Sequence, residues 1–147
     1  MNFSALSQND RIALVAGGVV AIAALISLVY NWGAIMIISL LAGLLAVVVI
    51  IQPSLLATLR LRGSKGSLLL IAGVGAALVN VLTGVDYLTW LTEHLVSFDA
   101  LQFIVGIVAA IALLYAGWMA YRAEGTMTAS AAPAPAAPPP APAPPSA

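Results

Sequence analysis

The residues that could carry out chemistry are few, and they gather in one short segment, residues 86–100. Asp86, Glu93 and Asp99 supply carboxylates there, and His94 supplies the single imidazole of the chain. A histidine beside a glutamate is a candidate general base, which an enzyme acting on lipids at a membrane surface could use. A lone imidazole makes no metal site, and the chain has no cysteine to serve as nucleophile or metal ligand. We expect these side chains to be solvated surface groups, and hence no enzymatic activity, cofactor or metal.

The other candidate is Asn80, a strongly polar side chain inside a long apolar segment. No charged residue occurs in the apolar segments, whereas ion and proton paths usually carry one. An amide in such a place lines a pore or bonds to a neighbouring helix. We expect the hydrogen bond, and we keep the pore as the alternative.

The composition indicates whether these residues belong to a water-soluble protein or to a membrane protein. The 147 residues are 63% hydrophobic and only 7% charged, with a mean hydropathy of +1.10. These values exclude a water-soluble globular protein. Five Lys or Arg balance five Asp or Glu, so no basic field is available to bind nucleic acid. The partner implied by the composition is the lipid bilayer.

The apolar segments predict four transmembrane helices. Residues 12–59 carry no charge and are long enough for two spans, with a break at residues 31–33 and a stop at Gln52-Pro53. Strands are excluded because the segments are apolar on every side. The fold class is therefore all-α, a four-helix membrane bundle of two helical hairpins, with spans at about 12–30, 34–51, 67–85 and 100–121. Capping patterns begin at Ser7 before the first span and at Asp99 before the fourth.

The cations predict the orientation of these spans. With four spans, Arg11 and Arg122 fall on the same side as Arg60, Arg62 and Lys65, whereas the opposite side is acidic. Lys and Arg mark the cytoplasmic side. We expect residues 1–11 and the C-terminal segment to be cytoplasmic, in a bacterial-type plasma membrane. Arg60, Arg62 and Lys65 are the residues expected to set the topology and meet lipid headgroups.

Aromatic side chains predict the two membrane boundaries, because amphipathic rings prefer the headgroup level. The expected anchors are Tyr30, Trp32, Tyr87 and Trp90 outside and Trp118 inside. Between the third and fourth spans, Leu88, Leu91, Leu95 and Phe98 recur at helical spacing. This pattern predicts a short helix lying in the outer interface, and an extension of the third span is the alternative.

Residues 123–147 are rich in Ala and Pro and cannot build a core. We expect a disordered cytoplasmic tail that samples polyproline II conformation. Pro135 with Pro138, and Pro142 with Pro145, have the spacing that Pro-recognition modules accept, although a plain spacer explains the same composition.

Small residues predict how the helices pack, because close approach of backbones replaces the hydrophobic effect inside lipid. The expected packing residues are Gly17, Gly43, Asn80, Gly106 and Gly117. A second small-residue face, formed by Gly73 with Ala77 and Gly106 with Ala110, is expected to contact another protomer or another subunit.

The functional hypothesis follows from small size, uncharged spans and small-residue faces. The general plan resembles that of small bacterial tetraspan membrane proteins. We expect a non-enzymatic accessory, assembly or structural subunit of a membrane complex, which binds another membrane protein or itself. The alternative is a homo-oligomeric channel or small-solute transporter with Asn80 at a pore between protomers.

Overall fold

The protein is all-helical throughout the part of the chain that its computed structural model describes, residues 6–30, 33–52, 54 and 64–130, with only the backbone of 127–130. The helices are α1 (Gln8–Val29), α2 (Met36–Ile51), α4 (Lys65–Asp86), α5 (Leu88–Glu93) and α6 (Phe98–Ser130). Helices α1, α4 and α6 are long and apolar enough to cross a membrane, and α2 is shorter at 16 residues. The chain is thus an all-helical membrane protein.

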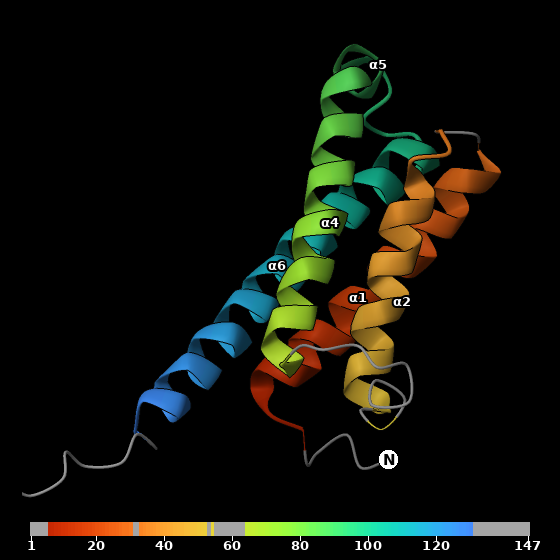
Figure 1. Ribbon diagram of the computed structural model, residues 1–147. Coiled ribbons are helices and arrows are strands. Elements are labelled where there is room, and N and C mark those ends of the chain that lie inside the picture. Colours follow the sequence, from red (N-terminus) through yellow and green to blue (C-terminus); the bar gives the residue numbers. More distant parts are fainter. Residues whose placement is uncertain (1–5, 31–32, 53, 55–63, 131–147) are drawn as a thin grey trace, which may run out of the picture.

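The four longer helices form a bundle in which each packs against two others. Helix α1 contacts α2 and α6, and α4 contacts the same two helices from the opposite corner. The start of α1, the end of α2, the start of α4 and the end of α6 lie toward one end (Figure 1). The α5 turn lies at the other end, beyond the end of α4 (Figure 1).

Helix starts follow from local capping chemistry. The Ser7 hydroxyl accepts a 3.2 Å hydrogen bond from the Asp10 amide, as its spacing predicts. Ser64 caps α4 in the same way through the Ser67 amide. The cap predicted at Asp99 is wrong: Ser97 accepts from the Ala100 amide, so Asp99 lies in the first turn of α6. An acid in the first turn of a helix is favoured by the helix dipole. Asp99 therefore resembles the start of a helix in the sequence, as Ser97 does.

Helix α6 is longer than predicted, so the predicted start of the tail at residue 123 is wrong. It runs to Ser130, so residues 123–130 are helical where a disordered tail was expected. The sequence here holds Ala, Met and Glu, which favour helix, and the first proline of the tail comes only at Pro133. Its last turns project past the other helices (Figure 1). The rest of the tail, with both Pro-x-x-P pairs, lies outside the described residues.

The segment between α4 and α6 also differs from its prediction. Helix α4 already includes Asp86, and α5 begins after the single residue Tyr87 and covers only six residues. The Tyr87 amide still bonds to the Thr83 carbonyl, and the Leu91 amide bonds to the Tyr87 carbonyl. Helix α5 is thus a separate short helix that follows α4 after a one-residue break. Its location in the outer interface, and the alternative of an extension of the third span, stay predictions.

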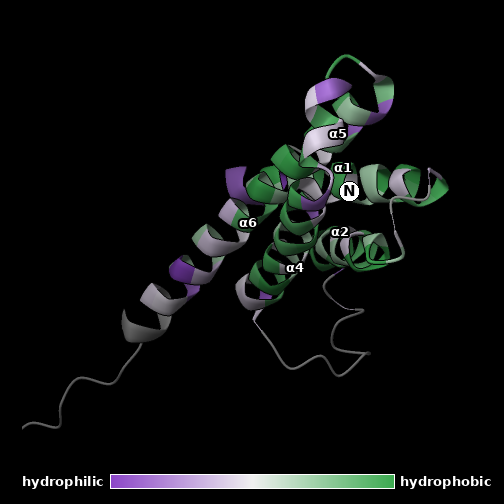
Figure 2. Ribbon diagram, turned by 90° about the horizontal axis from the view of Figure 1, so that it is seen from above, coloured by the Kyte–Doolittle hydropathy of each residue, from purple (hydrophilic) through white to green (hydrophobic). Residues whose placement is uncertain are grey.

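The interior of the bundle is rich in alanine, with Phe103, Met36, Leu69 and Leu113 as its largest buried side chains, and many large aliphatic residues lie on the outside. Ala13, Ala46, Ala76, Ala110 and Ala116 are at most 1% exposed. Large side chains on all four helices are about half exposed, among them Ile22, Ile38, Leu78 and Ile111. Figure 2 shows the hydrophobic colour on the helices of the bundle and hydrophilic colour at the α5 end and along α6. Such an apolar outer surface fits a lipid environment.

Candidate functional site

Asn80 lies in the interior of the bundle and joins two helices. It is 4% exposed on α4, and its amide nitrogen donates to the Ser39 hydroxyl of α2 at 2.7 Å and to the Ala76 carbonyl at 2.8 Å. Ser39 is fully buried. The expected interhelical hydrogen bond is therefore present. Asn80 therefore points into its own bundle, and the alternative of a pore between protomers stays a prediction.

Gln102 makes the equivalent connection between α1 and α6, which the sequence pattern did not predict. Its amide nitrogen donates to the Ala23 carbonyl at 2.7 Å and to the Ser27 hydroxyl at 3.2 Å. Its carbonyl oxygen is buried without a hydrogen-bond partner among the described residues. Gln102 comes three residues after Asp99, at the spacing of a capping pattern, although it lies inside α6. A glutamine within an apolar segment was the signal available.

Gly106 of α6 packs against Ala23 of α1 and Asn80 of α4, which corrects the expected protomer face. A Cβ on Gly106 would lie 3.1 Å from the Ala23 Cβ and 3.5 Å from the Asn80 side-chain oxygen. A Cβ on Gly73 would lie 2.5 Å from the Leu114 Cα of α6. Ala77 and Ala110 are also buried. The second small-residue face is therefore used inside the bundle, and it is not an outer surface.

The remaining predicted packing glycines bring backbones into contact. A Cβ on Gly43 of α2 would lie 2.6 Å from the Gly17 carbonyl oxygen of α1, and a Cβ on Gly117 of α6 would lie 2.7 Å from the Leu69 carbonyl oxygen of α4. Any side chain at Gly43 or Gly117 would push two helices apart. These positions set the helix spacing in both antiparallel pairs.

Charged side chains join the helix ends at the end of the bundle that holds the α1 N-terminus. Lys65 forms a 2.6 Å ion pair with Asp10, so the starts of α4 and α1 lie side by side. The Glu124 carboxylate of α6 accepts a 2.8 Å hydrogen bond from the Gly66 amide in the first turn of α4. A carboxylate at a helix N-terminus is favoured by the helix dipole. Arg60 and Arg62 lie outside the described residues.

The predicted acid–base residues lie at the opposite end of the bundle. Glu93 and His94 are exposed, and the His94 ring stacks on Trp90 with ring centroids 4.9 Å apart. The His94 Nδ1 lies 3.0 Å from the Trp90 carbonyl oxygen of its own turn. In the part of the chain that the structure describes, no three His, Cys, Asp or Glu residues come together as a metal site.

The predicted aromatic anchors lie at both ends of the bundle. Tyr30 and Tyr87 are 50% and 39% exposed, Trp90 is half-buried, and Trp118 is 48% exposed with the Arg122 guanidinium 5.9 Å from its ring centroid. Trp32 lies outside the described residues. Leu91 is 8% exposed, whereas Leu88, Leu95 and Phe98 are more than half exposed, so the predicted apolar face around α5 is mostly uncovered.

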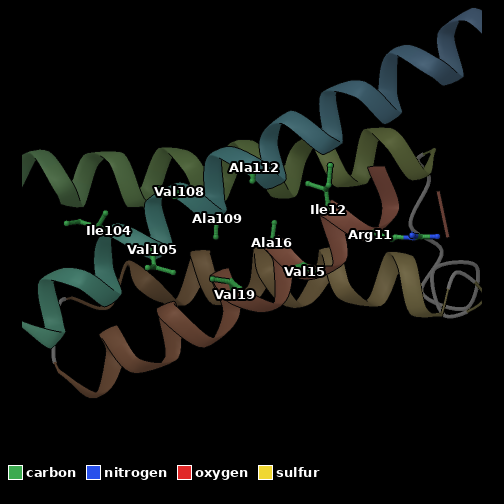
Figure 3. A pocket seen from close by; sticks show the side chains of 10 residues that line it. All are labelled: Arg11, Ile12, Val15, Ala16, Val19, Ile104, Val105, Val108, Ala109 and Ala112. Carbon is green, nitrogen blue, oxygen red and sulfur yellow. The ribbon is translucent and has the colours of Figure 1, made fainter. Parts of the chain in front are cut away.

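One apolar furrow opens on the surface between α1 and α6 (Figure 3). Its larger section has a volume of about 540 Å³ and begins beside Arg11. The other nine lining residues are Ile, Val or Ala. A second section shares Val19 and Val105 with the first and continues to Phe98. We call both sections together the α1/α6 furrow.

No family model, curated protein or solved structure matches the chain. The class of protein therefore rests on the fold and composition, which define an all-α protein with membrane-spanning helices.

Proposed function

We propose that the protein is a non-enzymatic accessory or structural subunit of a membrane complex, inserted as a four-helix bundle. One observation carries the proposal: the buried Asn80 amide donates to α2 and the half-buried Gln102 amide donates to α1, while many large aliphatic side chains lie on the outside of the bundle. A protein built in this way presents its neighbours with apolar surface and shape. Lateral packing in the membrane is the activity that such a surface supports.

The four-span arrangement is part of the proposal. Helix α2 has 16 residues and measures about 24 Å at 1.5 Å per residue, somewhat less than a hydrocarbon core of about 30 Å. Its two ends nevertheless lie near the two opposite ends of the bundle (Figure 1). A short span is accommodated by local thinning of the bilayer. In this arrangement α2 crosses together with α1, to which it is antiparallel.

The proposed orientation places the end that carries Arg11, Lys65 and Arg122 in the cytoplasm. The ion pair of Lys65 with Asp10 and the contact of Gly66 with Glu124 support a common position for these helix ends. Asp86, Glu93 and Asp99 belong to the opposite end. The positive-inside rule then assigns both termini to the cytoplasm.

Purification from native membranes tests the function. We would tag the natively expressed full chain, extract it in gentle detergent or nanodiscs, and identify accompanying proteins by mass spectrometry. The expected result is one membrane protein in a fixed stoichiometric ratio. Leu78→Ser changes an exposed position on α4 and tests for loss of a contact surface. Ser39→Ala changes a buried position and tests for loss of folding. Comparison of the two variants separates these effects.

Two results together would contradict the proposal. The chain would be recovered without a companion, and liposomes that hold only this protein would show solute flux. A tight liposome together with a stoichiometric companion would support it. Neither result depends on the identity of the companion being known beforehand.

A further inference from the structure

The larger section of the α1/α6 furrow is apolar along its length and carries a cation at one end. Of the ten residues that line its larger section, Arg11 alone is charged. Figure 3 shows aliphatic side chains from both helices around the furrow, with Arg11 at the end near the α1 N-terminus. A molecule that fits this arrangement has a long apolar part and an anionic head.

The length of the larger section of the furrow is close to the thickness of one leaflet of a bilayer. From Arg11 to Val19 the helix rises about 12 Å at 1.5 Å per residue, and half of a hydrocarbon core is about 15 Å. The volume of about 540 Å³ lies within the range of about 300–1,000 Å³ of small-molecule sites. An acyl chain lying along the larger section from the cation end would therefore end near the bilayer midplane.

The charges around the mouth favour an anion. The neighbouring acid, Asp10, is paired with Lys65 at 2.6 Å. The Arg11 Nε donates to the Leu6 carbonyl at 3.1 Å, which is one of the contacts of this residue. A guanidinium keeps its positive charge when it donates a hydrogen bond. A guanidinium has five N–H donors and binds phosphate well.

We propose that the α1/α6 furrow binds one anionic phospholipid of the cytoplasmic leaflet, with an acyl chain along Ala16, Val105 and Ala109 and the phosphate at Arg11. This site does not depend on the accessory-subunit proposal, because it requires only that the bundle is inserted with Arg11 at a membrane surface. It makes the protein selective among lipids without any partner protein.

Native mass spectrometry of the full chain with dioleoylphosphatidylglycerol and dioleoylphosphatidylcholine tests the site. The two lipids have the same acyl chains and differ in charge. We expect one phosphatidylglycerol to be retained in preference to phosphatidylcholine. Arg11→Gln should lower this preference about tenfold, which corresponds to about 1.4 kcal/mol. Arg122→Gln is the matched control, because it removes a cation from the same end without touching the furrow, and it should leave the preference unchanged.

A second variant tests the acyl part of the site. Ala112→Phe fills the furrow and should reduce retention of both lipids while the preference for phosphatidylglycerol per bound lipid persists. Helical content and the detergent melting temperature show whether each variant is folded. Equal retention of the two lipids by the wild-type protein would overturn the proposal. So would an equal loss in Arg11→Gln and Arg122→Gln, or a crosslink from Val108 to a partner protein that fills the furrow in native membranes.

Discussion

Asn80 and Ser39 are 41 residues apart in the chain and are joined by a 2.7 Å hydrogen bond between α4 and α2. The donor is an amide with almost no exposed surface, and the acceptor is a hydroxyl that is fully buried. Inside an apolar bundle, neither group has water as a substitute partner. The pair therefore holds α2 and α4 in one rotational setting.

The Asn80–Ser39 hydrogen bond should contribute a modest coupling energy. Asn80→Leu and Ser39→Ala each remove it, and a double-mutant cycle should give about 0.6 kcal/mol, with about 1.7 kcal/mol as an upper value for such bonds in membranes. The measurement is the free energy of unfolding in mixed micelles. Gln102→Leu with Ser39→Ala is the control pair, because Gln102 bonds to α1. Strict additivity of Asn80→Leu and Ser39→Ala would contradict the assignment.

Two glycines on the same helix should respond oppositely to alanine. A Cβ at Gly73 would lie 2.5 Å from the Leu114 Cα, whereas a Cβ at Gly75 meets nothing within 4 Å. Gly73→Ala should therefore destabilise the bundle by about 1–3 kcal/mol through overpacking. Gly75→Ala should be neutral or stabilising by up to about 1 kcal/mol, because alanine favours helix. Unfolding in mixed micelles checks both, and equal effects would refute the α4/α6 packing.

Glu124 should hold the end of α6 against the start of α4. Its carboxylate accepts from the Gly66 amide, a group that the helix itself cannot satisfy at this position. Glu124→Ala should cost about 1 kcal/mol and speed hydrogen exchange at the Gly66 amide. Glu124→Gln keeps an oxygen acceptor without the charge and should retain part of the protection. Unchanged exchange in Glu124→Ala would show that the contact does not form.

The proposed orientation can be checked by cysteine labelling, because the chain has no native cysteine. Val96 is 91% exposed beyond α5, and Thr126 is exposed near the end of α6. A membrane-impermeant maleimide should label Val96→Cys in intact cells and Thr126→Cys only after permeabilisation. Labelling of both variants in intact cells would exclude the four-span arrangement.

Much of the fold could be predicted from local sequence. The predicted spans at 12–30 and 67–85 lie within four residues of the ends of α1 and α4, and the Ser7 cap is confirmed. Gly17, Gly43 and Gly117 pack where expected. The end of α6 could not be placed, because a composition change at Glu124 does not stop a helix that has no proline before Pro133.

The sequence by itself determined that the chain is helical and apolar enough for a membrane, because hydropathy and run length are local properties. Only the tertiary structure decided that Gly73 and Gly106 face inward, that Gln102 binds α1, and that α1 and α6 leave a furrow beside Arg11. The physical reason is that these helices are apolar all round. The hydrophobic periodicity then carries almost no information about the rotation of each helix about its axis. Close packing of backbones, the buried Asn80 amide and the half-buried Gln102 amide select the helix faces that meet.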